Sequence, residues 1–107
     1  MKRVFVSIPM RGRSRDSIRE ESERLLTLAA AELKDDVVWV RNCWAGKWDS
    51  PLWSLGESLK RMSTADYVVF AQGWHGSSGC QIEHQCALLY GIAILDWVDL
   101  EEAYGDV

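Results

Sequence analysis

The sequence predicts an α/β fold: a three-layer open parallel sheet of the flavodoxin or Rossmann-like kind, with a strand order of about 2-1-3-4. Short apolar segments of strand length alternate along the chain with longer segments whose apolar residues recur at helical spacing. Each pair of successive strands is therefore joined by a helix, as a parallel crossover requires. A chain of 107 residues is long enough for one core, so we expect a single domain over residues 1–107.

The first part of the chain contains two predicted strands and a helix between them. Residues 4–8 and 37–40 are the apolar strand segments. Ser17 and Glu20 form a capping-box pattern that predicts the start of the helix, which should run to about Lys34. Its predicted inward face consists of Ile18, Leu25, Leu26, Ala29 and Leu33.

The middle of the chain continues the alternation. Residues 42–50 are predicted to form a loop, and Pro51 after Ser50 indicates a helix that continues to about Thr64. Residues 67–71 are the third predicted strand.

The last part of the chain begins with a loop rich in glycine and serine over residues 73–79. Ser78 and Gln81 suggest a capping box for the helix that follows, and Gly91 suggests its end. We expect Ile82, Cys86 and Leu89 of this helix to face inward. Residues 92–95 form the fourth predicted strand, and the acidic tail over 96–107 is expected to be partly helical.

Composition and charge restrict the function classes. The net charge is -4, and half of the basic residues lie within the first 19 positions, which suits a small anion better than a nucleic acid. Cys43, Cys80 and Cys86 are odd in number without a CxxC spacing, which favours reduced thiols. No apolar segment has the length of a membrane span or of a signal peptide, so we expect a cytoplasmic protein without a membrane partner.

Two loops are expected to meet at one end of the sheet. Residues 10–13 follow the first strand, and residues 73–79 follow the third. Open parallel sheets bind ligands at the carboxyl ends of their strands, near the point where the strand order reverses. Glu83 lies about one turn into the helix after the second loop, where a helix N-terminus attracts anions and a carboxylate can act on a bound ligand.

These motifs resemble the nucleoside 2-deoxyribosyltransferase superfamily. The resemblance is carried by Ser7-Ile8-Pro9-Met10-Arg11-Gly12 and by Gly73-Trp74 with Ser77, Gly79 and Glu83. It spans most of the chain, and it is closest to short uncharacterised members and next closest to 2'-deoxynucleoside 5'-monophosphate N-glycosidases. The resemblance implies a domain of this superfamily that cleaves or transfers an N-glycosidic bond of a (deoxy)nucleoside or its 5'-monophosphate.

The resemblance also implies roles for single residues. Glu83 corresponds to the nucleophile that attacks the anomeric carbon of deoxyribose. Ser77 and Gly79 match positions that hold the 5'-phosphate, and Arg11 would supply a guanidinium to it. The remaining expected substrate contacts are Ser7, Met10, Gly12 and Trp74, the last as a stacking surface for the base.

Three positions depart from the pattern of the superfamily and leave protonation of the leaving base unassigned. Phe5 stands where a tyrosine is frequent, Ile8 where a glycine is frequent, and Ser58 where the glycosidases have an aspartate. Glu57 and Asp49 are the two candidates for the general acid that would protonate the base. A helix carboxylate such as Glu57 is more often exposed to solvent.

Metal and partner expectations complete the sequence-based hypothesis. His75, Cys80, His84 and Cys86 lack a recognised zinc spacing, so we expect no metal, and we expect no other cofactor. The expected partners are a nucleoside or nucleotide and further copies of the chain. The alternatives are a non-catalytic nucleotide-binding module of the same fold and an interaction domain whose tryptophans form an interface.

Overall fold

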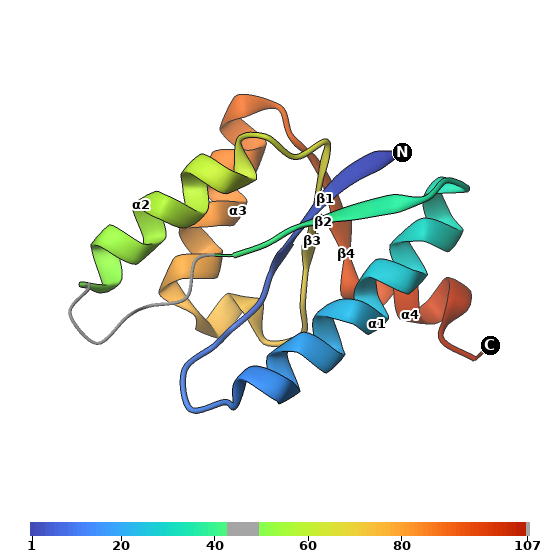
Figure 1. Ribbon diagram of the computed structural model, residues 1–107, viewed down its shortest axis with the longest axis horizontal. Helices are drawn as coiled ribbons and strands as arrows, with labels where there is room; N and C mark the ends of the chain where they lie inside the picture. The colour runs from blue at the N-terminus through green and yellow to red at the C-terminus, as the bar shows by residue number, and fades with distance from the viewer. Residues whose placement is uncertain (43–49, 107) are drawn as a thin grey trace.

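The computed structural model describes residues 1–42 and 50–106, and its strands form one parallel sheet in the order β2-β1-β3-β4 (Figure 1). The strands are β1 (Lys2–Ser7), β2 (Val37–Val40), β3 (Tyr67–Phe70) and β4 (Ala93–Asp96). The helices are α1 (Arg15–Leu33), α2 (Pro51–Met62), α3 (Ser78–Tyr90) and α4 (Trp97–Tyr104), with a short 3-10 helix η1 (Trp74–Gly76). The predicted fold class and strand order are confirmed.

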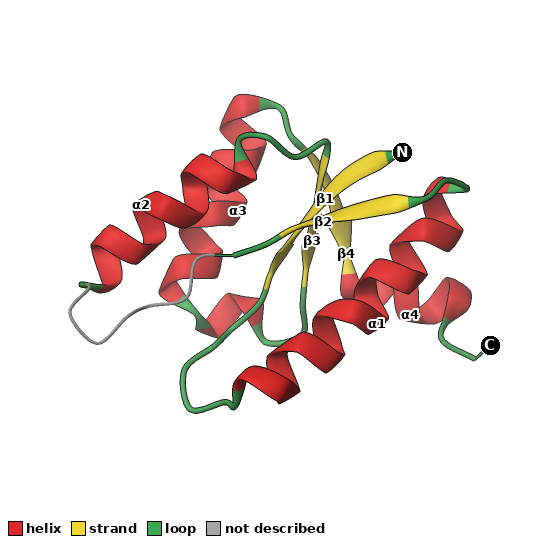
Figure 2. Ribbon diagram, viewed as in Figure 1, coloured by secondary structure: helices red, strands yellow, loops and turns green. Residues whose placement is uncertain are grey.

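Helices cover both faces of the sheet, which gives three layers (Figure 2). Because side chains alternate along a strand, Val4 and Val6 pack beneath α1 and α4, whereas Phe5 packs on the other face with residues of α2 and α3. Val6 pairs with Val69, and Ser7 with Phe70, so β1 and β3 end side by side. The topology reverses at this pair of strands, which is where α/β sheets of this kind bind ligands.

The start of α1 differs from the predicted capping box. Ser14, not Ser17, is the N-cap, and its hydroxyl oxygen accepts a hydrogen bond from the Ser17 N–H. Arg15 is the first helical residue, so Ser17 already lies inside the first turn. The predicted inward face of α1 is confirmed, since Ile18, Leu25, Leu26 and Ala29 are buried and Leu33 packs against the same core.

The inward face of α3 also differs from the prediction. The buried side chains are Cys80, Glu83 and Ala87, spaced three and four residues apart. Ile82 and Leu89 are exposed instead, and Cys86 is only partly buried. Because α3 carries apolar residues on most of its circumference, its period alone does not decide which face packs against the sheet.

The remaining element ends lie within two residues of their predicted positions. The acidic tail contains α4, as expected, and the Asp96 side chain caps this helix by accepting from the Val98 N–H. Across the described ranges, no helix combines the length and apolar character that a membrane crossing would need.

Candidate functional site

A cleft of about 230 Å³ opens at the carboxyl end of β1, on the face of the sheet covered by α2 and α3. Its walls come from the loop after β1, the segment just after β2, the first turns of α2 and the start of α3. The lining residues are Ile8, Met10, Arg11, Asn42, Pro51, Ser54, Leu55, Ser58, Ser77, Gly79, Cys80 and Glu83. The predicted meeting of the two loops is therefore observed, with a wall from α2 that the loops alone did not predict.

Glu83 lines the cleft and forms a hydrogen-bonded pair with Ser7, which lies behind it and does not line the cleft. The Ser7 hydroxyl donates to Glu83 Oε1 over 2.7 Å. Ser7 is the last residue of β1 and follows Phe5 on the face that packs against α3, so strand alternation aims its hydroxyl at that helix. Both side chains are buried, and Glu83 is only 5% exposed. Ser7, expected to contact the substrate, contacts the candidate nucleophile instead.

Burial raises the pKa of the Glu83 carboxyl from its ordinary value of 4.5 to about 7, and the Ser7 hydrogen bond opposes this rise. Within the described chain, Ser7 is the one hydrogen-bond donor to this carboxyl, and none of the ion pairs there includes it. The ionised form therefore lacks the compensation that a buried carboxylate normally receives. A carboxyl with this pKa can be ionised or protonated near neutral pH, which suits a nucleophile or a proton carrier.

The loop after β1 presents Arg11 to the cleft through a tight turn. The Arg13 N–H donates to the Met10 carbonyl, and Gly12 has a φ of 75°, which favours glycine at the third position of such a turn. Gly12 does not line the cleft, so its observed role is to shape the turn rather than to approach a ligand. Arg13 is held by the Glu21 carboxylate at 2.8 Å and anchors the loop to α1.

The start of α3 supplies the second wall. Ser77, not the predicted Ser78, is the N-cap, and its oxygen accepts from the Cys80 N–H over 3.4 Å. The Ser77 hydroxyl can still donate to a ligand because capping uses only an acceptor lone pair. Gly79 lies in the first turn and its missing side chain leaves room in the cleft, since a Cβ there would meet only Leu55 Cδ1, at 4.0 Å.

Trp74 lies outside the cleft, contrary to its expected role against a base. It is largely buried, its ring stacks on His84 at 4.3 Å and on His75 at 3.7 Å, and Phe70 packs against it at a tilt. These contacts take up the ring surfaces that a base would need. Trp74 therefore supports the fold beneath α3.

The candidates for a general acid are not brought to Glu83. Glu57 does not line the cleft and pairs with Lys60 at 2.8 Å, and Asp49 lies outside the described residues. Ser58 does line the cleft, in the position where the resemblance would have an aspartate. Phe5 is fully buried in the core. The described residues contain no cluster of three or more histidine, cysteine or acidic side chains arranged to hold a metal ion.

Several cleft residues were not predicted from the sequence, among them Asn42, Ser54 and Cys80. The Asn42 side chain donates from Nδ2 to the Val6 carbonyl over 2.7 Å. The backbone carbonyl of Asn42 accepts from the Arg61 guanidinium. Ser54 is buried in the α2 wall with an unpartnered hydroxyl oxygen. Cys80 is buried one turn before Glu83, and desolvation raises the pKa of its thiol. Of these three residues, Asn42 alone could have been predicted from the sequence, because it follows a strand at the edge of the sheet where ligands bind.

Comparisons of the chain with family models, with curated proteins and with solved structures found no match. A functional hypothesis therefore depends on the cleft itself and on the motif residues that line it.

Proposed function

We propose that this protein cleaves or transfers the N-glycosidic bond of a (deoxy)nucleoside or its 5'-monophosphate, with Glu83 as the nucleophile. The observation that carries the proposal is the buried Glu83 carboxyl in an open cleft, oriented through one oxygen by Ser7. Its second oxygen, Oε2, accepts no hydrogen bond from the described residues and can face a sugar. A buried, oriented carboxylate stabilises or traps the positive charge that develops on a sugar as its base departs.

The proposed reaction has two steps. In the first, Glu83 Oε2 forms a bond to the anomeric carbon while the C–N bond breaks, and the electron pair leaves with the base nitrogen, which takes a proton from solvent. In the second, water attacks the same carbon, the ester bond to Glu83 breaks, and the proton of the water passes to solvent. A second base in place of water would give transfer instead of hydrolysis. Ser7 keeps Oε1 occupied throughout, so that the free oxygen reacts.

A phosphate group of the substrate is proposed to lie at the N-terminus of α3. Ser77 and Gly79 line this end of the cleft, and Arg11 lines the cleft from the loop after β1. A helix N-terminus, a hydroxyl donor and a guanidinium together favour a dianion, whereas a free nucleoside would leave Arg11 without a charged partner. The nucleoside 5'-monophosphate is therefore the preferred substrate class.

A non-catalytic nucleotide-binding module is the second candidate function, and one observation favours it. Among the described cleft residues, Glu83 is the only carboxyl group, so no second acid stands ready to protonate the leaving base. In this case Glu83 would accept a hydrogen bond from a sugar hydroxyl without reacting. The nucleotide would then remain intact in the cleft.

One experiment separates the two functions. The protein is incubated with a panel of deoxynucleoside and nucleoside 5'-monophosphates, and free base is measured by chromatography. The enzyme hypothesis expects base release that Glu83→Gln abolishes and that Glu57→Gln, the removal of a carboxylate outside the cleft, leaves unchanged. Calorimetric binding of a nucleotide that stays intact supports the module, and equal base release by Glu83→Gln and the wild type contradicts the nucleophile.

A further inference from the structure

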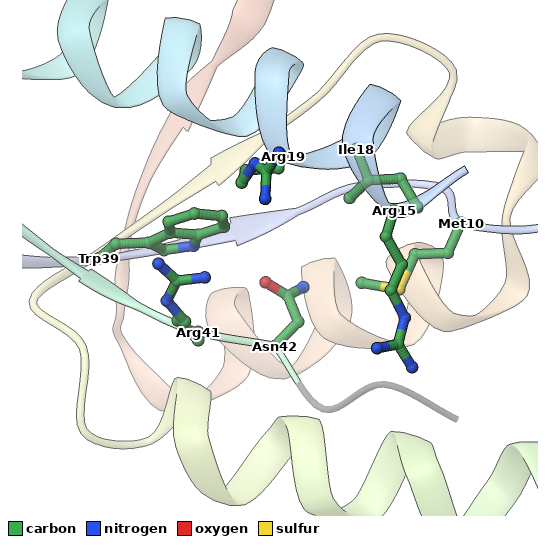
Figure 3. A pocket seen from close by; sticks show the side chains of 7 residues that line it. All are labelled: Met10, Arg15, Ile18, Arg19, Trp39, Arg41 and Asn42. Atoms are coloured by element: carbon green, nitrogen blue, oxygen red, sulfur yellow. The ribbon is translucent and has the colours of Figure 1, made fainter. Parts of the chain in front are cut away.

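A second pocket lies on the opposite face of the sheet, between α1 and the end of β2 (Figure 3). Arg15 and Arg19 line it from the first turns of α1, and Arg41 lines it from the segment after β2. None of the described residues that line this pocket is acidic. Three arginines that line one cavity are unexpected in a chain whose net charge is -4.

The pocket is rich in hydrogen-bond donors. The Arg41 guanidinium stands over the Trp39 ring, 4.3 Å from its centroid, and Figure 3 shows Arg19 on the other side of that ring. The Trp39 indole nitrogen is buried without a hydrogen-bond partner. Arg19 pairs with Asp16, but Asp16 points from the exposed surface of α1 and does not line the pocket. Arginine side chains carry only donors, so a ligand that binds them must supply acceptors.

The positive charge continues past the pocket. Trp39 and Arg41 also line a neighbouring depression whose other cations are Arg3, Arg61 and Lys60, of which Lys60 is paired with Glu57. The guanidinium groups of Arg3 and Arg61 are held by the neutral oxygens of Thr64 and Asn42, so their charges are not cancelled by a carboxylate at these contacts. The edge of β2 therefore has a positive potential that favours a multiply charged anion.

The arginine pocket adjoins the Glu83 cleft. Met10 and Asn42 line both cavities, at the carboxyl ends of β1 and β2. The Asn42 amide is fixed by its hydrogen bond to the Val6 carbonyl, so the boundary between the cavities is built from an anchored side chain. A ligand that extends over the end of β1 could thus reach both.

We propose that Arg15, Arg19 and Arg41 form a second anion site, which binds a phosphoryl group beside the Trp39 indole ring. The phosphoryl group belongs either to a free anion such as inorganic pyrophosphate or to the outer phosphate of a nucleotide held in the Glu83 cleft. Only the second source depends on the proposed function. The site itself follows from the donors around this pocket.

The test uses inorganic pyrophosphate as the probe, at low ionic strength, with calorimetry for affinity and NMR for the Trp39 indole N–H, assigned through Trp39→Phe. The wild type should bind the probe and shift that resonance. Arg19→Gln with Arg41→Gln should weaken binding at least tenfold. The control, Arg24→Gln with Lys34→Gln, also removes two positive charges, one within α1 and one at its C-cap. Both residues lie outside the pocket, so this control should change the affinity less than twofold.

Nucleoside mono- and diphosphates then distinguish the source. A diphosphate that binds at least tenfold more tightly than the monophosphate, with this advantage lost in the Arg19 and Arg41 double variant, assigns the site to the outer phosphate of a nucleotide. If pyrophosphate binds but the diphosphate binds no more tightly than the monophosphate, the site is assigned to a free anion. This assignment holds whether or not Glu83 cleaves a nucleotide. Equal pyrophosphate affinity in the double variant and the wild type, equal weakening in the control, or an unmoved Trp39 resonance would overturn the proposal.

Discussion

The hydroxyl of Ser7 donates a 2.7 Å hydrogen bond to Oε1 of Glu83, across a sequence separation of 76 residues. This contact joins the end of β1 to the second turn of α3 and places the carboxyl inside the cleft. It also opposes the desolvation that raises the pKa of Glu83 to about 7. The first predictions concern this pair.

Glu83→Gln should stabilise the protein at alkaline pH. The carboxyl has a pKa of about 7 in the folded protein and an ordinary value of 4.5. Between these pH values the native state holds a proton that the unfolded state has lost, so the free energy of unfolding falls as pH rises through this window. Because glutamine does not titrate, the variant keeps this part of its free energy of unfolding, which amounts to about 3 kcal/mol. Denaturant unfolding should show the variant to be more stable at pH 8 and nearly equal to the wild type at pH 4, and an equal difference at both pH values would contradict the pKa.

Ser7→Ala should destabilise the fold and raise the pKa of Glu83 further. It removes the one described donor to a buried carboxyl, at a cost of about 1 to 3 kcal/mol. Ser22→Ala is the matched control, because Ser22 is equally buried but its hydroxyl oxygen has no partner. Chemical denaturation gives both stabilities, and NMR titration of the Glu83 side chain gives its pKa. Equal effects of the two substitutions would mean that the Ser7 contact adds no stability.

Base release, if observed, should increase with pH up to about 7 and then level off. A nucleophilic carboxyl must be ionised, and burial holds the pKa of Glu83 near this value. The measurement is kcat/KM for a nucleoside 5'-monophosphate between pH 5 and pH 9, and the same profile for the free nucleoside separates the titration of Glu83 from that of the phosphate, whose second pKa is about 6. A rate that falls above pH 7 would instead indicate that Glu83 acts in its protonated form, as a general acid.

Gly79→Val should block the ligand while leaving the fold intact. A Cβ at this position has room beside Leu55, so the added methyl groups project into the cleft without a backbone clash. We expect at least a tenfold loss of nucleotide affinity by calorimetry. Gly56→Ala is the control, since Gly56 lies in α2 with open space around it and does not line the cleft. Unchanged affinity in Gly79→Val would place the ligand elsewhere.

The exposed face of α3 should form contacts between copies of the chain. Ile82, Leu88, Leu89 and Tyr90 are exposed, and Leu89 is 69% exposed, which is a large apolar surface for one short helix. Leu89→Glu should shift the protein toward a monomer in light scattering coupled to size exclusion. Val98→Glu, a similar change at an exposed apolar residue of α4, should leave the mass unchanged. A wild type that is already monomeric at high concentration would contradict this prediction.

Much of the fold could be predicted because it depends on local patterns. Strand-length apolar runs alternating with helical periods determine parallel crossovers, and parallel crossovers bring the ends of β1 and β3 together. The inward face of α1 was predicted for the same reason, since its apolar residues form a single stripe. The positions of Arg11, Ser77, Gly79 and Glu83 around one cleft follow from this topology.

The details of the helix starts could not be read from the same patterns. Two serines stand near the start of α1 and two near the start of α3, and each can cap a helix in isolation. Ser14 and Ser77 are the caps because the incoming chain is extended at these residues, with ψ angles of 155° and 120°. That backbone conformation depends on how the preceding loop crosses the end of the sheet.

The sequence by itself determined the order of the elements, the strand order and the edge of the sheet where polar residues gather, because these follow from periodicity and from the handedness of crossovers. Only the tertiary structure decided that Glu83 turns toward Ser7, that Trp74 is covered by two histidines, and that three arginines surround a pocket next to the cleft. The physical reason is that the rotation of a helix about its axis is set by the close packing of its whole surface against the sheet. For α3 the face that packs against the sheet carries Cys80, Ala87 and the Glu83 carboxyl.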